Sequence, residues 1–334
     1  MPALLVSRPF FDLYGERISA FLAASSMMRV VVLDPCGALA PQDIADVETA
    51  FLSTDVMGAS SNPQHNPALA AFLEAVAAAP RLRWLQLCSA GADRPVFLEL
   101  MARGVEVTTA SGANALEVAH TAMAAALAFA REVPVWIDAK ATRAWSPRRD
   151  DLAPRDFQGS HATVVGMGNI GREIARLCGA FGLQVTGVRR TIQSLPECAR
   201  VVSMDALATV LPQTDWLFLA CPLTPETRGL VDKAVLAQLP VHARLINVSR
   251  GAVVDETALM DALVSCRLAG AYSDVFATEP LPAQSPLWDA PNFMLSAHSA
   301  GSSQGFPART VEIFMDNLKR RLRGEPLRNL AIAP

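Results

Sequence analysis

The sequence has little net charge and no closely spaced pair of cysteines. Charged residues make up 18% of its 334 residues, and the net charge of −3 gives no basic surface of the kind that nucleic-acid-binding proteins use. The six cysteines include no C-x-x-C pair, and several lie in apolar runs where thiols behave as small hydrophobic groups. We therefore expect reduced structural cysteines, no metal site, no nucleic-acid partner and a small-molecule ligand.

Long uninterrupted apolar runs are missing as well. The most apolar helical segment, residues 115–130, is interrupted by Glu117 and His120, and residues 1–8 lack the basic start of a secretory signal. These features predict a cytoplasmic protein without membrane spans. The 51% apolar content over this length is sufficient for two domain cores.

Short β-type runs alternate with segments of helical length along most of the chain. In the first third the β-type runs are 4–6, 30–33, 50–52, 82–87 and 105–108, and the helical segments are 41–49, 67–79 and 95–103. The alternation resumes through 183–188, 203–211, 216–220, 232–239, 244–248, 255–266, 268–275 and 293–295, and residues 307–323 have amphipathic helical spacing. The pattern predicts an α/β protein with parallel sheets.

A glycine-rich turn lies between one of these strands and a helix. Gly166, Gly168 and Gly171 follow the apolar run that ends at Val165, and helical spacing extends from Arg172 to Phe181. Glycines at this spacing permit a tight turn, close approach of the backbone to a pyrophosphate and close packing of helix on strand. The sequence therefore predicts a dinucleotide site, although glycines can also serve a turn alone.

The long helical segment 115–130 is apolar on nearly every face and should be buried on several sides, as an interdomain or intersubunit helix would be. Asn114 and Glu117 have the spacing of a capping box at its start. His120 is interpreted as a core or interface histidine, with a ligand role as the alternative. Residues 136–160 lose periodicity and are interpreted as a surface arm.

Three polar residues, Arg250, Glu279 and His298, each follow a predicted strand. Reduction of a 2-oxo acid needs a cation for the carboxylate, a proton donor for the developing alkoxide and a partner that keeps the donor charged. Arginine, histidine and glutamate are the residue types for these tasks. The alternative is a surface ion pair beside an unrelated loop histidine.

Residues 89–93 follow the strand that ends at Leu87, so they lie at a carboxyl strand end, where open α/β sheets bind ligands. An ordinary strand-to-helix turn is the alternative interpretation.

Arg189 and Arg190 stand at the end of the strand after the glycine turn, where enzymes that use NAD place an acidic residue for the ribose 2′-hydroxyl. No acid is present there. Two arginines instead favour a 2′-phosphate, as in NADP, with two solvated arginines as the alternative.

The order of these motifs resembles the D-isomer-specific 2-hydroxyacid dehydrogenase family, which includes glyoxylate/hydroxypyruvate reductases and phosphoglycerate dehydrogenases. The resemblance covers nearly the whole chain. It is carried by the segments 164–171 (VVGMGNIG), 221–229 (CPLTPETRG), 246–255 (INVSRGAVVD), 274–280 (DVFATEP) and 286–298 (beginning PLW and ending at His298).

The resemblance implies two doubly wound parallel-sheet domains, a Rossmann dinucleotide-binding domain of residues 112–301 inserted into a flavodoxin-like substrate domain of residues 1–111 and 302–334. It implies catalytic roles for Arg250, Glu279 and His298, and substrate-carboxylate binding by backbone N–H groups at Ala90, Gly91 and Ala92 together with Arg250. Asp274 should bind the nicotinamide carboxamide. The full set of cofactor-binding residues expected is Gly166, Gly168, Asn169, Ile170, Gly171, Arg189, Arg190, Cys221, Pro222, Thr227, Val248, Ser249, Asp274, His298 and Ala300.

The chain departs from the family pattern at three positions. Ala297 replaces a common proline, Ser299 replaces a usual apolar residue, and His120 stands where a glutamate is frequent. These changes leave the three catalytic candidates in place. Glu279 argues against formate dehydrogenase activity, because the resemblance implies that the formate dehydrogenases of the family carry glutamine at this position.

The sequence thus predicts an enzyme that reduces a small 2-oxo acid, of the glyoxylate or hydroxypyruvate type, to the D-2-hydroxy acid, and catalyses the reverse oxidation. NADP(H) is the preferred cofactor, NAD(H) remains possible, and a homodimer is expected from the family and from the apolar helix. The alternative is a nucleotide-sensing, corepressor-like protein of the same fold without turnover.

Overall fold

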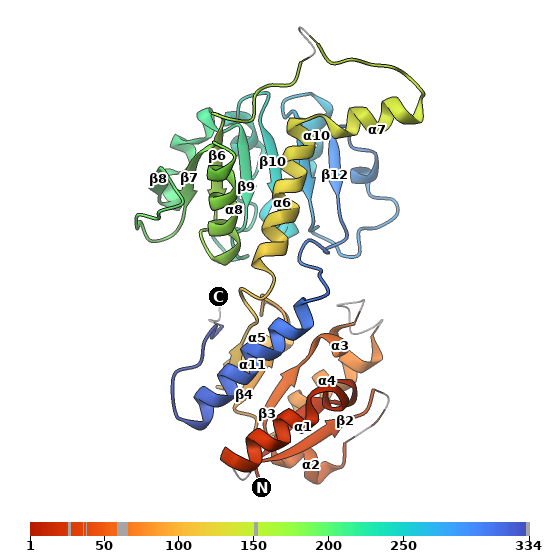
Figure 1. Cartoon of the computed structure of the whole chain (residues 1–334), viewed down its shortest axis with the longest axis vertical. Coiled ribbons are helices and arrows are strands. Elements are labelled where there is room, and N and C mark those ends of the chain that lie inside the picture. Colours follow the sequence, from red (N-terminus) through yellow and green to blue (C-terminus); the bar gives the residue numbers. More distant parts are fainter. Residues whose placement is uncertain (26–27, 36, 38, 59–65, 150–152, 332–334) are drawn as a thin grey trace. The chain divides into compact units, whose positions relative to one another are not determined.

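The computed structural model describes the whole chain except residues 26–27, 36, 38, 59–65, 150–152 and 332–334. The chain forms two compact units. Unit 1 consists of Met1–Ala113 and Gln304–Pro334, and unit 2 of Asn114–Ser303. In Figure 1 unit 1 therefore carries the colours of both ends of the chain, red to orange and blue.

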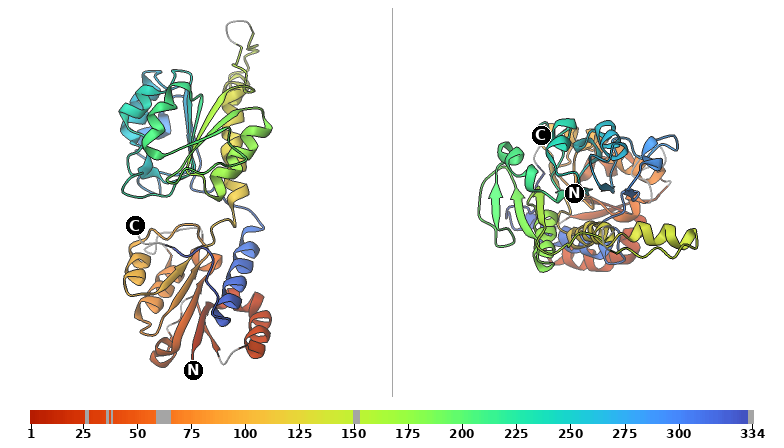
Figure 2. Two further views of the ribbon diagram at one scale, coloured as in Figure 1. Left: turned by 90° about the vertical axis from the view of Figure 1, so that its left-hand side faces the viewer. Right: turned by 90° about the horizontal axis from the view of Figure 1, so that it is seen from above.

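Unit 1 contains a parallel sheet in the order β2-β1-β3-β4-β5. Its strands are β1 (Ala3–Ser7), β2 (Arg29–Leu33), β3 (Val47–Leu52), β4 (Trp84–Leu87) and β5 (Glu106–Thr108). Helices α1 (Arg8–Ser25) and α11 (Phe306–Leu322) cover one face of the sheet, and α4 (Pro67–Ala78) and α5 (Pro95–Ala102) cover the other (Figure 2, left). This arrangement is the flavodoxin-like fold that the sequence predicted.

Alternate residues of β1 point into the two cores of unit 1. Leu5 packs with α4 and α5, whereas Leu4 packs with α1 and α11. The core under α11 is aromatic, because Phe314 stacks on Phe51 with ring centroids 4.4 Å apart and on Trp84 at 5.8 Å. The helix near the C-terminus is therefore part of the first unit's core.

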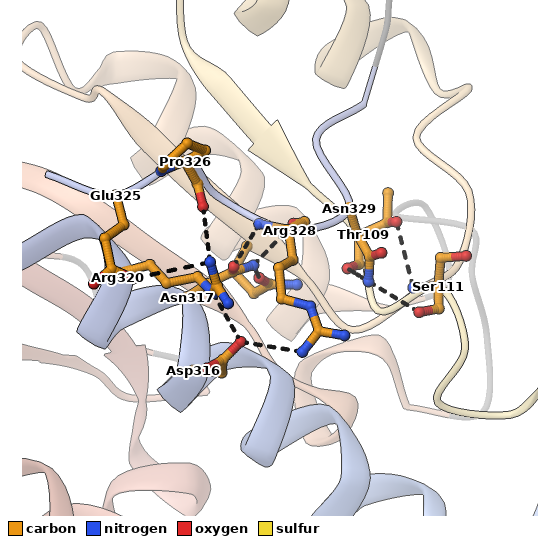
Figure 3. Close-up of polar contacts among 10 residues, drawn as sticks. Thr109, Ser111, Asp316, Asn317, Arg320, Glu325, Pro326, Arg328 and Asn329 are labelled. Atoms are coloured by element: carbon orange, nitrogen blue, oxygen red, sulfur yellow. Dashed lines mark hydrogen bonds and ion pairs between the residues drawn. The ribbon is translucent and has the colours of Figure 1, made fainter. Parts of the chain in front are cut away.

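The segment after α11 completes the edge of the same sheet (Figure 3). The buried Asn317 side chain donates to the Arg328 carbonyl at 3.1 Å and accepts from the Arg328 N–H at 2.8 Å. The next residue, Asn329, accepts from the Thr109 N–H at 3.0 Å and donates to the Ser111 carbonyl at 2.9 Å. This segment thus lies beside β5, with one antiparallel bridge to it.

Unit 2 contains a second parallel sheet in the order β12-β11-β10-β9-β6-β7-β8. Its strands are β6 (His161–Val165), β7 (Gln184–Val188), β8 (Arg200–Val202), β9 (Trp216–Leu219), β10 (Arg244–Asn247), β11 (Gly270–Ser273) and β12 (Phe293–Leu295). Helices α6 (Ala115–Ala130) and α8 (Asn169–Ala180) pack on one face, and α9 (Lys233–Gln238) and α10 (Glu256–Val264) on the other (Figure 2, left). The strand order reverses between β6 and β9, as in a Rossmann fold, so the predicted fold class is confirmed.

Shorter elements complete the two units. They are the helices α2 (Pro41–Asp46), α3 (Thr54–Met57) and α7 (Val133–Ala141) and the 3₁₀ helices η3 (Met204–Thr209), η4 (Leu211–Gln213), η5 (Gly251–Val253) and η6 (Pro286–Asp289). Within the described residues no helix is both long and apolar enough to cross a membrane.

Several local predictions were wrong. The helix expected over residues 41–49 ends at Asp46, because the β-branched Val47 and Thr49 pair with β1 in strand β3. The sequence analysis missed α1, whose Pro9 and Gly15 weaken the helical signal although Pro9 lies in the first turn, where proline is tolerated. It also missed α7 within the expected arm.

The start of α6 differs from the predicted capping box as well. The helix begins at Ala115, but the Asn114 side chain makes no cap hydrogen bond, because its backbone (φ −125°, ψ 16°) is not extended. The amide instead lies against Gly301, where an added Cβ would come within 2.2 Å of Asn114 Nδ2. His120 is exposed on α6, so it is not a core histidine of this chain.

Candidate active site

The glycine turn of unit 2 has the geometry of a dinucleotide site. Gly166 has φ +95°, and a Cβ there would lie 2.5 Å from the Cys221 backbone, while a Cβ on Gly171 would lie 1.9 Å from the Gly166 carbonyl oxygen. Both positions therefore require glycine. An added Cβ on Gly168 would meet nothing within 4 Å, and no side chain caps the first turn of α8, which begins at Asn169. Open space before uncapped N–H groups fits a pyrophosphate.

The remaining candidates of unit 2 follow other strands of the same parallel sheet, so they lie along one edge. Arg189 and Arg190 follow β7, the segment from Cys221 and Pro222 to Thr227 follows β9, Val248–Arg250 follow β10, Asp274 and Glu279 follow β11, and His298 and Ala300 follow β12. Carboxyl strand ends are where ligands bind in this type of sheet.

The two arginines after β7 are not held by carboxylates within hydrogen-bonding distance among the described residues. Arg189 is half-buried, and its Nη1 reaches only Gln193 Oε1 at 3.5 Å. Arg190 is exposed and near enough to Glu226 for its charge to help lower the pKa of that carboxyl, after hydrogen bonds from Thr224 and the Glu226 backbone. Both guanidinium groups are thus available to an anionic ligand.

Thr227 is engaged within its own loop. Its hydroxyl donates to the Pro222 carbonyl at 2.7 Å and accepts from the Thr224 N–H at 2.7 Å. These bonds close the loop after β9. A cofactor contact by the Thr227 side chain would have to compete with them.

The turn after β10 is organised by Asn247, which the sequence analysis did not single out. Its buried amide oxygen accepts from the N–H and the hydroxyl of Ser249, at 3.0 and 2.6 Å, and its Nδ2 donates to the Arg250 carbonyl at 3.3 Å. Gly251 must be glycine, because a Cβ would lie 1.9 Å from the Phe276 carbonyl carbon. The turn therefore holds Arg250 against the loop that carries Glu279.

Glu279 and His298 form a hydrogen-bonded pair. His298 Nδ1 lies 2.7 Å from Glu279 Oε2, and the other carboxylate oxygen accepts from the Phe276 N–H at 2.9 Å. The His298 side chain is 49% exposed. Because Nδ1 is bound to the carboxylate, Nε2 is the ring nitrogen that can serve a substrate.

Asp274 fixes the loop that presents His298. Its carboxylate accepts from the N–H groups of Ser299 and Ala300, at 2.8 and 3.1 Å, and from the Ser296 hydroxyl at 2.5 Å, while its carbonyl accepts from the His298 N–H at 2.8 Å. His298 has φ +50°, a left-handed conformation that persists only when neighbouring contacts enforce it. The Ser299 bond uses the backbone, so replacing the family's apolar residue there does not open the loop.

The charges at this site favour a protonated histidine beside an ionised carboxylate. The Glu279 hydrogen bond raises the pKa of His298, against the opposing effects of burial and of the Arg250 charge. Burial opposes ionisation of Glu279, but the bonds from His298 and the Phe276 N–H outweigh it and lower the pKa of the carboxyl. Arg250 is close enough to act on both groups. The arrangement can donate a proton and attract an anion at one place.

These directions predict how activity depends on pH. If His298 is the proton donor, reduction of an oxo acid should stay fast below its raised pKa and decline as pH rises through it. Glu279→Gln removes the charge that raises this pKa, so the decline should move to lower pH. We would measure kcat against pH for both proteins, with Glu173→Gln on α8 as control. An identical profile in Glu279→Gln would contradict the pairing.

The expected substrate residues Ala90, Gly91 and Ala92 belong to unit 1 and follow β4. Their loop is held by the Ser89 hydroxyl, which donates to the Gly91 carbonyl at 2.8 Å, and by the Ala110 N–H, which donates to the Ser89 carbonyl at 2.8 Å. The loop thus has a fixed shape at the carboxyl edge of the unit 1 sheet, and its role in binding remains a prediction.

The cysteines show no redox or metal-binding arrangement in the described part of the chain. Cys88, Cys178, Cys198, Cys221 and Cys266 are free, and Cys36 lies outside the described residues. Burial raises the pKa of Cys88 and Cys178 to about 12 and that of Cys221 to about 11, so these thiols stay protonated. The described residues contain no cluster of three metal-ligating side chains.

Unit 2 thus combines a Rossmann-type sheet, the glycine turn of a dinucleotide-binding fold and a His–Glu pair at the same sheet edge. Residues 123–300 match the family described as "D-isomer specific 2-hydroxyacid dehydrogenase, NAD binding domain". The chain belongs to the D-isomer-specific 2-hydroxyacid dehydrogenase family, as the sequence motifs predicted.

Curated relatives show the same affiliation. The chain is 34% identical to the glyoxylate reductase of Korarchaeum cryptofilum over 262 residues, which are 77% of this chain and 78% of the relative. It is 31% identical to the D-3-phosphoglycerate dehydrogenase of Mycobacterium tuberculosis over 252 residues, 75% of this chain. The match spans 47% of the length of that dehydrogenase, so the chain covers about half of such relatives.

Solved structures of the family superpose along nearly the whole chain. A family member from Aeromonas salmonicida has a TM-score of 0.79 at 26% identity, covering 100% of this chain and 99% of its own. A member from Xanthobacter autotrophicus, solved in complex with NADPH and MES, has a TM-score of 0.75 at 30% identity, covering 99% and 98%.

Proposed function

We propose that the protein is a reductase of small 2-oxo acids that uses NADPH in preference to NADH and forms the D-2-hydroxy acid. The observation that carries this proposal is the 2.7 Å pair of His298 and Glu279 beside Arg250, at the same sheet edge as the glycine turn. A proton donor, its carboxylate partner and a guanidinium are the groups that reduction of an oxo acid requires.

In this mechanism the cofactor supplies a hydride to the carbonyl carbon when it is bound at the glycine turn. His298 Nε2 donates a proton to the carbonyl oxygen as negative charge develops there. Glu279 holds the ring through Nδ1 and favours its protonated form. Arg250 binds the substrate carboxylate and polarises the carbonyl. In the reverse direction the neutral histidine accepts the hydroxyl proton.

We assign cofactor binding to unit 2 and substrate-carboxylate binding to the N–H groups of Ala90, Gly91 and Ala92 in unit 1. Relatives named glyoxylate reductase and glyoxylate/hydroxypyruvate reductase favour a short, polar 2-oxo acid. The exposed Trp136 and Ile137 on α7 and the almost fully exposed Trp145 favour a homodimer, and we propose a cytoplasmic location.

A kinetic screen tests this function. Purified protein should oxidise NADPH with glyoxylate or hydroxypyruvate, measured by absorbance across a panel of 2-oxo acids with each reduced cofactor. Tight NADPH binding without turnover on the whole panel would contradict the enzyme and favour the nucleotide sensor.

Cofactor choice gives a further prediction. A charge-assisted bond to the 2′-phosphate contributes about 1.5–3 kcal/mol, or roughly 10–100-fold in affinity. Wild-type protein should prefer NADPH by about that factor, mainly through KM, because the phosphate is remote from the reacting carbon. Arg189→Asp should invert the preference, since the carboxylate repels the phosphate and can bind the 2′-hydroxyl.

Arg190→Ala should only weaken the preference, because Arg190 lies farther from the strand end. Arg176→Ala, an exposed arginine on α8, is the control. The measurement is kcat/KM for both cofactors at moderate salt, where attraction to the phosphate is only partly screened. Equal values in wild type would contradict the NADP assignment and leave both arginines as surface charges.

A further inference from the structure

Unit 2 has a polar cavity at the sheet edge opposite the candidate active site. The cavity has a volume of about 640 Å³, and its lining includes His161, Asp215, His242, Arg244 and Arg155. Asp215 directly precedes β9, and His161 and Arg244 are the first residues of β6 and β10. In a parallel sheet these amino ends lie at one edge and the glycine turn and Arg250 at the other. The cavity is therefore separate from the active site.

Arg244 is the central cation of this cavity. Its guanidinium packs over the rings of Trp216 and Phe129, with centroid distances of 5.2 and 5.9 Å. One nitrogen, Nη1, donates to the His242 carbonyl at 3.3 Å, whereas the buried Nε has no hydrogen-bond partner. Nε itself is enclosed, so a bound oxyanion would pair with this guanidinium through its outer nitrogens.

Glu132 and Asp215 are engaged by partners other than the Arg244 guanidinium. The negative charge of Glu132 raises the pKa of Arg244, against the larger effect of burial. Both oxygens of Glu132, however, accept from Arg148, at 2.7 and 3.0 Å. Asp215 accepts from His242 Nε2 at 2.6 Å and from the His161 N–H at 2.8 Å. Among the described residues no carboxylate forms an ion pair with Arg244.

A second guanidinium reinforces the positive charge. Arg155 lines the cavity, is exposed, and is close enough for its charge, after burial, to lower the pKa of Arg244. The lining also holds the carboxylates of Asp156 and Asp215, so its formal charge is balanced. The two guanidinium groups still repel each other, and an oxyanion bound by both would reduce this repulsion. The two histidines each keep one ring nitrogen that is not engaged by Asp215.

We propose that this cavity binds a small organic oxyanion, a carboxylate or phosphate ester, between Arg244 and Arg155. The volume lies within the range of small-molecule sites and exceeds what a single inorganic ion needs. Arginine pairs bind carboxylate and phosphate oxygens through parallel N–H bonds. The site is a second ligand site, independent of turnover at Arg250.

Calorimetric titration of the full chain with citrate, and separately with inorganic phosphate, tests the site at pH 7 and low salt. Titrations in the Arg250→Lys background should give the same affinity, which separates this site from the active site and from any failure of the proposed reductase function. Citrate binding above phosphate identifies a carboxylate site, and the reverse identifies a phosphate site.

Two variants change the site in different ways. Arg244→Lys keeps a charge but loses the planar guanidinium fork, and should weaken binding by about 10- to 100-fold. Arg155→Ala, at an exposed position that does not threaten folding, should weaken it by about 10-fold. Arg200→Ala, on the first residue of β8 and outside the cavity lining, is the control and should bind like wild type.

Three results would overturn the proposal: no binding of either anion to wild type, equal losses in Arg200→Ala and Arg155→Ala, or unchanged binding in both site variants. If wild type binds neither anion and Arg155→Ala alone shifts the sedimentation coefficient to a smaller species, an acidic side chain of a second copy occupies the cavity instead.

Discussion

Replacing His298 by alanine should lower kcat for oxo-acid reduction by about 10²–10⁴-fold, the usual cost of losing a general acid. The Nδ1 bond to Glu279 leaves Nε2 as the only ring nitrogen for proton transfer, so no other atom of the residue can replace it. Cofactor affinity should change little, because the glycine turn and the helix that follows it are untouched. Stopped-flow kinetics and NADPH fluorescence titration measure the two quantities.

The control for this experiment is His120→Ala, which removes an exposed histidine of the same unit from α6. It should retain wild-type kcat. If His298→Ala also keeps wild-type kcat, the proton comes from another group and the His–Glu pair is structural.

Arg250→Lys should give the second large effect. Lysine keeps the positive charge but loses the planar fork, so at least one charge-assisted bond worth about 1.5–3 kcal/mol disappears, which corresponds to roughly 10–100-fold in kcat/KM. KM for the oxo acid should rise and kcat should fall, because the same group binds the carboxylate and polarises the carbonyl. Steady-state kinetics with glyoxylate at saturating NADPH measure both.

Arg250→Lys has a second informative readout in the pH profile. The positive charge of Arg250 lowers the pKa of His298, and lysine preserves that charge, so the pH of decline should stay near that of wild type. Arg176→Lys on α8 is the matched control. If only cofactor affinity changed in Arg250→Lys, Arg250 would belong to the nucleotide site and the carboxylate would be bound elsewhere.

The sequence allowed the two sheets and the glycine turn to be predicted because their signals are local. Gly166 and Gly171 leave no room for a side chain. Residues 161–165 form a short, mostly apolar run whose side chains are buried on both faces of a sheet. The capping box at Asn114 failed because the backbone of this residue is not extended, and its amide lies beside Gly301, which is distant in the sequence. Local spacing cannot report such a contact.

The residues that hold the candidate site in place could likewise not be identified from the sequence. Asn247 and Ser296 are ordinary polar residues in the sequence, yet the first shapes the turn before Arg250 and the second bonds Asp274. Asp274 was expected as a cofactor ligand, but the structure also shows its carboxylate holding the His298 loop. Its second carboxylate oxygen accepts from the Ala300 N–H at 3.1 Å, a bond shared with the first oxygen.

Unit 1 is assembled from two stretches that are separated by the whole of unit 2, and this connectivity fixes an order of events at the ribosome. Unit 2 is continuous and can fold as soon as it has emerged. The first stretch of unit 1 must wait, with the aromatic face of Phe51 and Trp84 uncovered, until Phe314 is synthesised. During that interval the edge of β5 also lacks its antiparallel neighbour at Leu330. We therefore expect the nascent chain to expose apolar surface and an unpaired strand edge in its first third, which is synthesised earliest and completed last.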